Sequence, residues 1–106
     1  DIPLGQGGLD LKTMVAILKK AKPNIHFSLE LITRDPLKVP CLTEQYWATL
    51  SKLPARDLAR TLRYVREHSS DTLQHISKMT EKERLAREDL NVRQSLDYAR
   101  DELGLA

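Results

Sequence analysis

The run "NIHFSLELI", residues 24–32, limits the folds open to this chain more than any other stretch. Strand side chains alternate between two faces. One face would hold Ile25, Phe27, Leu29 and Leu31, and the other His26, Ser28, Glu30 and Ile32. We therefore predict a β-strand that is apolar on one side. No second convincing strand follows it, although a strand needs partners for its backbone groups. We expect those partners to precede Asp1, so that the chain is a fragment of a larger fold.

A loop and a helix are predicted before this strand. The loop is "PLGQGG", residues 3–8, and Asp10 is placed to cap the helix that follows. Apolar residues at helical spacing are Leu11, Met14, Val15 and Leu18, and Pro23 ends the helix. A helix leading directly into a half-apolar strand is typical of repeating β/α folds, in which helices cover the sheet.

The middle of the chain predicts two shorter helices. Thr43 can cap a helix over residues 44–52. Pro54 is predicted to occupy the first position of a helix over residues 54–68, where its missing N–H is not needed. Acids accompany the arginines on this second helix, so we interpret its polar face as solvated.

A long helix is predicted at the end of the chain. Thr80 and Glu83 have the spacing of a capping box, and Gly104 is the expected stop. The apolar stripe of this helix is thin and consists of Leu85, Val92, Leu96, Ala99 and Leu103. We therefore expect a surface helix, and periodicity leaves open whether it packs against the main domain or across the interface of a homo-oligomer.

Composition excludes several classes of protein. The chain has 106 residues, of which 41% are hydrophobic and 30% charged, as in an ordinary globular protein. Its net charge of +2 comes from interspersed bases and acids, so we expect no nucleic-acid partner. No apolar run is long enough to cross a membrane. Because Cys41 is the single cysteine, no internal disulfide can form, and we expect a cytoplasmic protein.

Residues 3–37, "PLGQGGLDLKTMVAILKKAKPNIHFSLELITRDPL", resemble the end of the xylose-isomerase-like TIM barrels, the superfamily of sugar and sugar-phosphate isomerases and epimerases. That family has an LGxGxxD stretch, then a helix, then a last strand ending in glutamate. The matching residues are Leu4, Gly5, Gly7, Asp10 and Glu30. The resemblance implies an α/β fold. Residues 1–40 would be the last βα unit and closing strand of a (β/α)8 barrel, and residues 41–106 a helical extension packed on or beside it.

The resemblance also implies a site at the end of that strand, where TIM barrels place their catalytic groups. Glu30 would be a metal ligand and a catalytic proton carrier, sharing a divalent cation (Mn, Mg, Co or Zn) with ligands from earlier strands. Arg34 would bind a substrate phosphate or carboxylate. From the residues alone, other readings stay open: an acid at a strand end is commonly solvated or ion-paired, and Asp35 can shape a turn and pair with Arg34.

Three functions follow from these readings. The first is isomerisation or epimerisation of a small sugar, sugar phosphate or sugar acid through a metal-stabilised enediolate. The second is metal-dependent decarboxylation of an oxo-sugar acid in the same superfamily. The third is a non-catalytic helical interaction domain, in which the predicted strand augments a partner's sheet and Glu30 is incidental. For either enzyme, we expect these 106 residues alone to be inactive.

Overall fold

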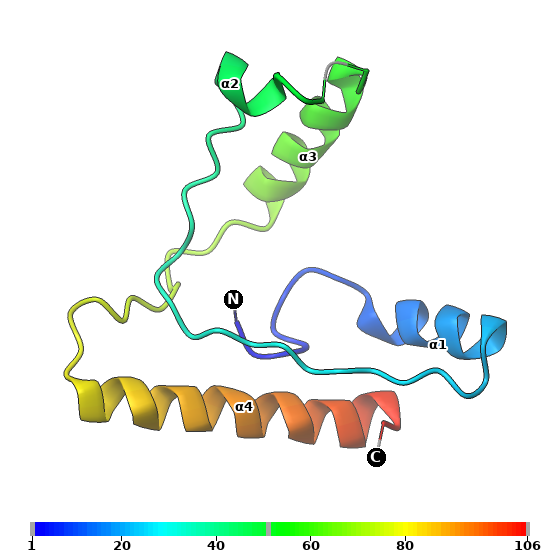
Figure 1. Cartoon of the computed structure of the whole chain (residues 1–106), viewed down its shortest axis with the longest axis vertical. Coiled ribbons are helices and arrows are strands. Elements are labelled where there is room, and N and C mark those ends of the chain that lie inside the picture. The colour runs from blue at the N-terminus through cyan, green and yellow to red at the C-terminus, as the bar shows by residue number, and fades with distance from the viewer. Residues whose placement is uncertain (1, 51, 106) are drawn as a thin grey trace. The chain divides into compact units, whose positions relative to one another are not determined.

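The computed structural model describes residues 2–50 and 52–105, which belong to two compact units. One unit combines Asp1–Asp35 with Gln74–Ala106, and the other is Pro36–Leu73. The C-terminal helix therefore belongs to the same unit as the beginning of the chain (Figure 1).

All regular structure in the described residues is helical, so the predicted α/β fold, a fragment of a TIM barrel, is wrong. The helices are α1 (Leu11–Ala21), α2 (Glu44–Trp47), α3 (Ala55–Glu67) and α4 (Glu81–Leu103). The predicted strand over residues 24–32 is an extended stretch without a ladder partner in the described part of the chain. An alternation of apolar and polar residues indicates that a segment is extended with one apolar face. A β-strand also requires a neighbouring segment whose backbone forms hydrogen bonds with it.

Helix α1 begins and ends as predicted. The Asp10 side chain accepts a hydrogen bond from the Thr13 N–H at 3.0 Å and thereby caps the first turn. Lys19 and Lys20 lie in the last turn, where positive charge suits the helix dipole. The helix ends at Ala21, just before Pro23.

Helix α4 has the predicted ends but a different buried face. Thr80 and Glu83 form the capping box, and Gly104 ends the helix in the left-handed region with φ of 58°. The expected apolar stripe is wrong in part, because Leu85 and Leu96 are exposed. The buried positions are Asn91 and Ser95. The Asn91 side chain donates to the Thr33 hydroxyl and the Ser95 hydroxyl accepts the Leu4 N–H, whereas an apolar stripe would need an apolar layer opposite it.

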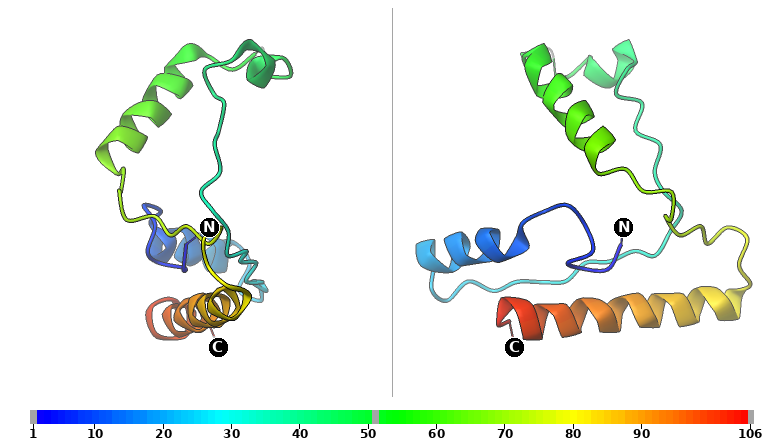
Figure 2. Two further views of the ribbon diagram at one scale, coloured as in Figure 1. Left: turned by 90° about the vertical axis from the view of Figure 1, so that its left-hand side faces the viewer. Right: turned by 180° about the vertical axis from the view of Figure 1, so that it is seen from behind.

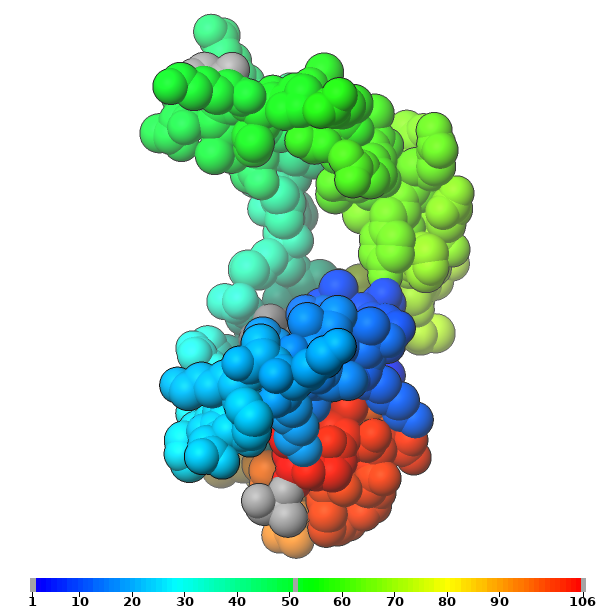
Figure 3. All heavy atoms as spheres, turned by 90° about the vertical axis from the view of Figure 1, so that its right-hand side faces the viewer, coloured from blue at the N-terminus to red at the C-terminus, as the bar shows by residue number. Residues whose placement is uncertain are grey.

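Helix α1 and the extended segment, residues 25–35, both lie along α4 in the first unit (Figures 1 and 2). The extended segment runs antiparallel to α4, because residues 25–30 line a groove with the C-terminal turns of α4 while Thr33 bonds to Glu88 and Asn91. Seen from the side, α1 lies against the C-terminal turns of α4 (Figure 3). Val15 of α1 is buried at this contact.

The second unit contains α2 and α3. Thr43 caps α2 by accepting the Tyr46 N–H at 3.4 Å, as predicted. The helix ends at Trp47, earlier than predicted, because the Leu50 N–H donates to the Trp47 carbonyl only three residues back. Pro54 is the N-cap of α3 with an extended ψ of 141°, so the prediction that it is the first helical residue is wrong by one position.

Candidate functional site

A chain of hydrogen bonds attaches the extended segment and the N-terminal loop to α4. The Asn91 side-chain amide donates to the Thr33 hydroxyl oxygen at 3.0 Å. The Thr33 N–H donates to the Glu88 carboxylate at 3.1 Å. The Leu4 N–H donates to the Ser95 hydroxyl oxygen at 3.0 Å, and that hydroxyl donates to the Asn91 carbonyl at 2.7 Å. Because Thr33, Asn91 and Ser95 are buried, these bonds fix one end of the extended segment.

Asp35 fixes the chain just beyond this point. Its Oδ1 accepts the N–H of Ile76, and also the N–H of Ser77 at 3.0 Å. The hydrogen bonds from Ser77 lower the pKa of the Asp35 carboxyl from its ordinary value of 3.8. Asp35 therefore holds the segment to the chain that leads into α4, a role that the sequence did not suggest.

The other end of the first unit is held by lysines of α1. Lys12 forms an ion pair with Glu102 near the end of α4, and this bond raises the pKa of Lys12. The Lys19 ammonium donates to the Gly104 carbonyl at 2.9 Å, which satisfies a terminal carbonyl of α4. These contacts set α1 against the C-terminal turns of α4.

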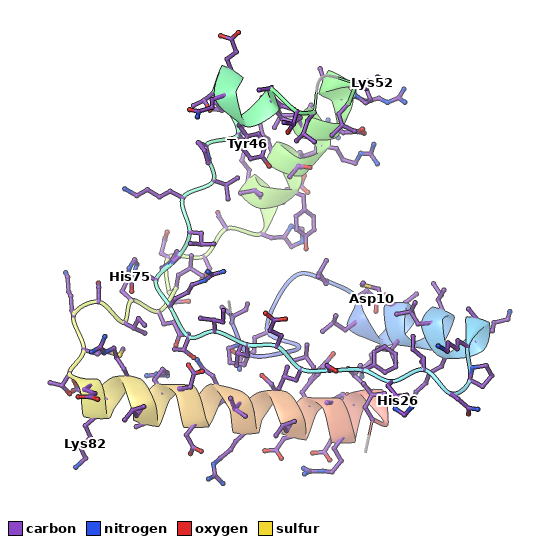
Figure 4. The ribbon with its side chains drawn as sticks, viewed as in Figure 1. Asp10, His26, Tyr46, Lys52, His75 and Lys82 are labelled. Carbon is purple, nitrogen blue, oxygen red and sulfur yellow. The ribbon has the colours of Figure 1, made fainter. Side chains whose placement is uncertain are left out.

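Between the fixed ends of the extended segment, residues 26–31 have no backbone hydrogen-bond partner among the described residues. The Ile25 N–H donates to the Lys22 carbonyl at 3.0 Å, and pairing resumes at the C-terminal end of the segment. Across residues 26–31, no N–H or carbonyl forms a hydrogen bond with any residue that the structure describes. The side chains of residues 26–30 are also exposed to solvent (Figure 4 labels His26). We call residues 26–31 the open strand.

An apolar groove lies beside the open strand. It has a volume of about 600 Å³ and is formed by α1, the open strand and the C-terminal turns of α4. Its apolar lining includes Met14, Leu18, Phe27, Leu29, Leu96 and Leu103. Most of these side chains are more than one third exposed, among them Phe27 at 37% and Leu29 at 39%. The groove is therefore an apolar surface that the described residues leave uncovered.

The two predicted site residues lie in different parts of the extended segment. Glu30 lies on the open strand and lines the groove, and its carboxylate has no hydrogen-bond or ion-pair partner among the described residues. Arg34 is half-buried and lies between Thr33 and Asp35, in the part that is held to the rest of the unit.

The described residues do not form a complete metal site. Among them, no three His, Cys, Asp or Glu side chains lie together in a way that could hold an ion. Hard divalent cations take several oxygen ligands, and Glu30 offers one carboxylate. The resemblance implies that the other ligands lie outside this sequence. Binding of the predicted cation therefore stays a proposal, and it requires ligand residues that these 106 residues do not supply.

Comparison of the chain with models of protein families, with curated proteins and with solved structures finds no significant match. The resemblance to the sugar isomerases therefore rests on the sequence of about the first half of the chain, and the activity that it implies stays a prediction. In the described part of the chain, no helix is both long enough and apolar enough to cross a membrane.

Proposed function

We propose that this chain is an interaction module that pairs with a β-strand along residues 26–31. One observation carries the proposal: an extended, solvent-exposed run whose backbone donors and acceptors have no partner in the described structure. Such groups are a template for an added strand, because main-chain hydrogen bonds form with little regard to sequence. This is the third of the functions considered from the sequence.

The fixed ends of the open strand favour this function. Thr33 and Asp35 hold one end, and the Ile25–Lys22 turn bond holds the other. A segment that is already extended loses less conformational entropy when it pairs than a flexible one. The adjoining groove gives the side chains of an added strand apolar surface to cover, which adds to the main-chain bonds.

The test uses a short synthetic peptide of alternating valine and threonine with lysine ends as a generic strand. We expect it to protect the amides of residues 26–31 from hydrogen exchange, as followed by NMR. Ser28→Pro removes an N–H in the middle of the open strand and is expected to abolish this protection, whereas Ser28→Thr retains it. Peptide binding that leaves these amides unprotected would contradict the proposal, and so would amides that stay unprotected both with the peptide and at every protein concentration.

A second candidate is the metal-dependent sugar isomerisation or epimerisation implied by the resemblance. The observation in its favour is that the Glu30 carboxylate is exposed and forms no hydrogen bond or ion pair with any described residue. A bound divalent cation would polarise the oxygens of the substrate, and Glu30 would supply one of its ligands. In this proposal Arg34 holds a phosphate or carboxylate of the substrate.

This candidate is tested on a longer protein that contains this chain and supplies the remaining ligands, by measuring bound metal together with ketose–aldose interconversion. We expect Glu30→Gln to lose metal and activity together, whereas Asp71→Asn, an exposed acid in the second unit, changes neither. Release of carbon dioxide from an oxo-sugar acid would instead indicate the decarboxylase. Unchanged metal content in Glu30→Gln would remove Glu30 from the site.

A further inference from the structure

We infer that the strand that pairs with the open strand is the open strand of a second copy of this chain, arranged antiparallel. The inference rests on the proposed function and names its partner. Two copies related by a two-fold axis present the same surface to each other, so every contact occurs twice. The open strand must then be complementary to itself when it is turned around, and the sequence around Ser28 meets this condition.

In the register where Ser28 lies opposite Ser28 of the second copy, each remaining position meets a residue of matching chemistry. His26 lies opposite Glu30, Phe27 opposite Leu29, and Ile25 opposite Leu31. A ring N–H of His26 can donate to the Glu30 carboxylate in either charge state of the imidazole. Both residues are exposed and neither has a partner among the described residues.

Other arrangements of the same two strands are less favourable. A parallel pair in register would place Glu30 beside Glu30 of the second copy, and like charges directly opposite each other repel. An antiparallel pair shifted by one position would place Ile25 opposite Glu30 and mix the apolar and polar faces. The register centred on Ser28 avoids both penalties, because apolar residues meet apolar residues and the acid meets the imidazole.

The apolar pairs give the dimer its buried area. Phe27 and Leu29 are more than one third exposed in the single chain, and the register places them against each other twice. Aromatic and aliphatic residues on facing strands stabilise a sheet. A two-stranded ribbon alone is marginal in water, but here each strand also lines an apolar groove together with α1 and α4.

The experiment measures self-association by sedimentation equilibrium of the full chain over a range of concentrations. We expect a monomer–dimer equilibrium. Glu30→Lys sets a cation against His26 and should weaken dimerisation about tenfold, because two pairs are lost by symmetry. His26→Glu should weaken it similarly. The double variant His26→Glu, Glu30→Lys recreates opposite charges across the strands and should restore dimerisation. Asp71→Lys makes the same charge change away from the open strand and should have no effect.

Ser28→Pro, with its helix content checked by circular dichroism, should be monomeric. A chain that stays monomeric at every concentration, while the generic peptide still protects residues 26–31, overturns this inference and leaves the proposed function standing. A dimer that is unaffected by Ser28→Pro overturns it as well, since the interface then lies elsewhere. Failure of the double variant to restore dimerisation overturns the register. If neither the peptide nor a second copy protects these amides, the proposed function also fails.

Discussion

Asp35 and Ser77 are 42 positions apart in the sequence, yet the Asp35 carboxylate accepts the Ser77 N–H at 3.0 Å. The same oxygen accepts the N–H of Ile76. One side chain thus joins the two stretches of chain that come immediately before and after the unit Pro36–Leu73. It also fixes the position at which the extended segment ends along α4, so the geometry of the open strand depends on it.

Replacing Asp35 by alanine is expected to release Ile76 and Ser77. The two backbone N–H groups lose their acceptor, so their amides should exchange with solvent several-fold faster than in the unchanged chain. Hydrogen exchange measured by NMR checks this. Asp71→Ala removes an exposed acid of the second unit and is the control. Equal exchange of the Ser77 amide in both variants would show that Asp35 does not hold this stretch.

The same contact predicts a dependence of stability on pH. The pKa of Asp35 in the folded chain is lower than its ordinary value of 3.8. The carboxylate therefore stabilises the fold fully above that ordinary value, and its contribution is lost as the pH falls through the lower folded pKa.

The measurement is the free energy of unfolding of the unchanged chain and of Asp35→Asn as the pH is lowered. Other acids with lowered pKa values, such as Asp10 and Glu83, contribute to both proteins and cancel in the difference. The difference between the two proteins should shrink with falling pH. A difference that stays constant from neutral to acid pH would contradict the assignment.

The parts of the fold that the sequence predicted correctly depend on local chemistry. Asp10, Thr43 and the Thr80–Glu83 pair each cap a helix within a few residues of themselves, and Gly104 takes the left-handed conformation that ends α4. Such signals need only the neighbouring backbone. The predicted strand failed because a strand depends on a distant segment, and the described chain offers none to residues 26–31.

The buried face of α4 was missed for a related reason. Asn91 and Ser95 lie four positions apart on one side of the helix, but polar residues at such spacing are usually solvated. Their burial depends on Thr33 and Leu4, which bring hydrogen-bonding groups to them from far along the chain. Within the candidate site, the choice of Glu30 stays a prediction, whereas the roles of Thr33 and Asp35 could not be predicted without the packing.

Asn91→Ala is expected to destabilise the first unit by about 2 kcal/mol, since it removes a buried hydrogen bond and leaves the Thr33 hydroxyl without its donor. Asn91 is 2% exposed, so water cannot easily replace the lost amide. Unfolding in urea provides the free energy. Arg84→Ala, on an exposed position of the same helix, is expected to change it little. Equal effects of the two substitutions would contradict the proposed role of the Asn91–Thr33 bond.

Two glycines of the N-terminal loop provide a matched pair. Gly5 has a φ of 85°, and a methyl group added there would collide with the Tyr98 ring. At Gly7 the nearest atom to an added methyl group lies 3.6 Å away, on Ile2. We expect Gly5→Ala to lower the unfolding free energy by about 1–3 kcal/mol, because it combines backbone strain with a clash. Gly7→Ala should have a much smaller effect. Loss of stability at both positions alike would show that the loop is not held against Tyr98.

Residue-by-residue amide hydrogen exchange tests the central claim most directly, because that claim concerns the backbone of residues 26–31. In dilute solution, these amides should exchange nearly as fast as those of an unfolded chain, while amides in the middle of α4 are protected. At higher concentration, or with the generic strand peptide, the amides of the open strand should become protected. Protection of residues 26–31 in the dilute, unbound chain would contradict the account, and so would their full exposure under every condition.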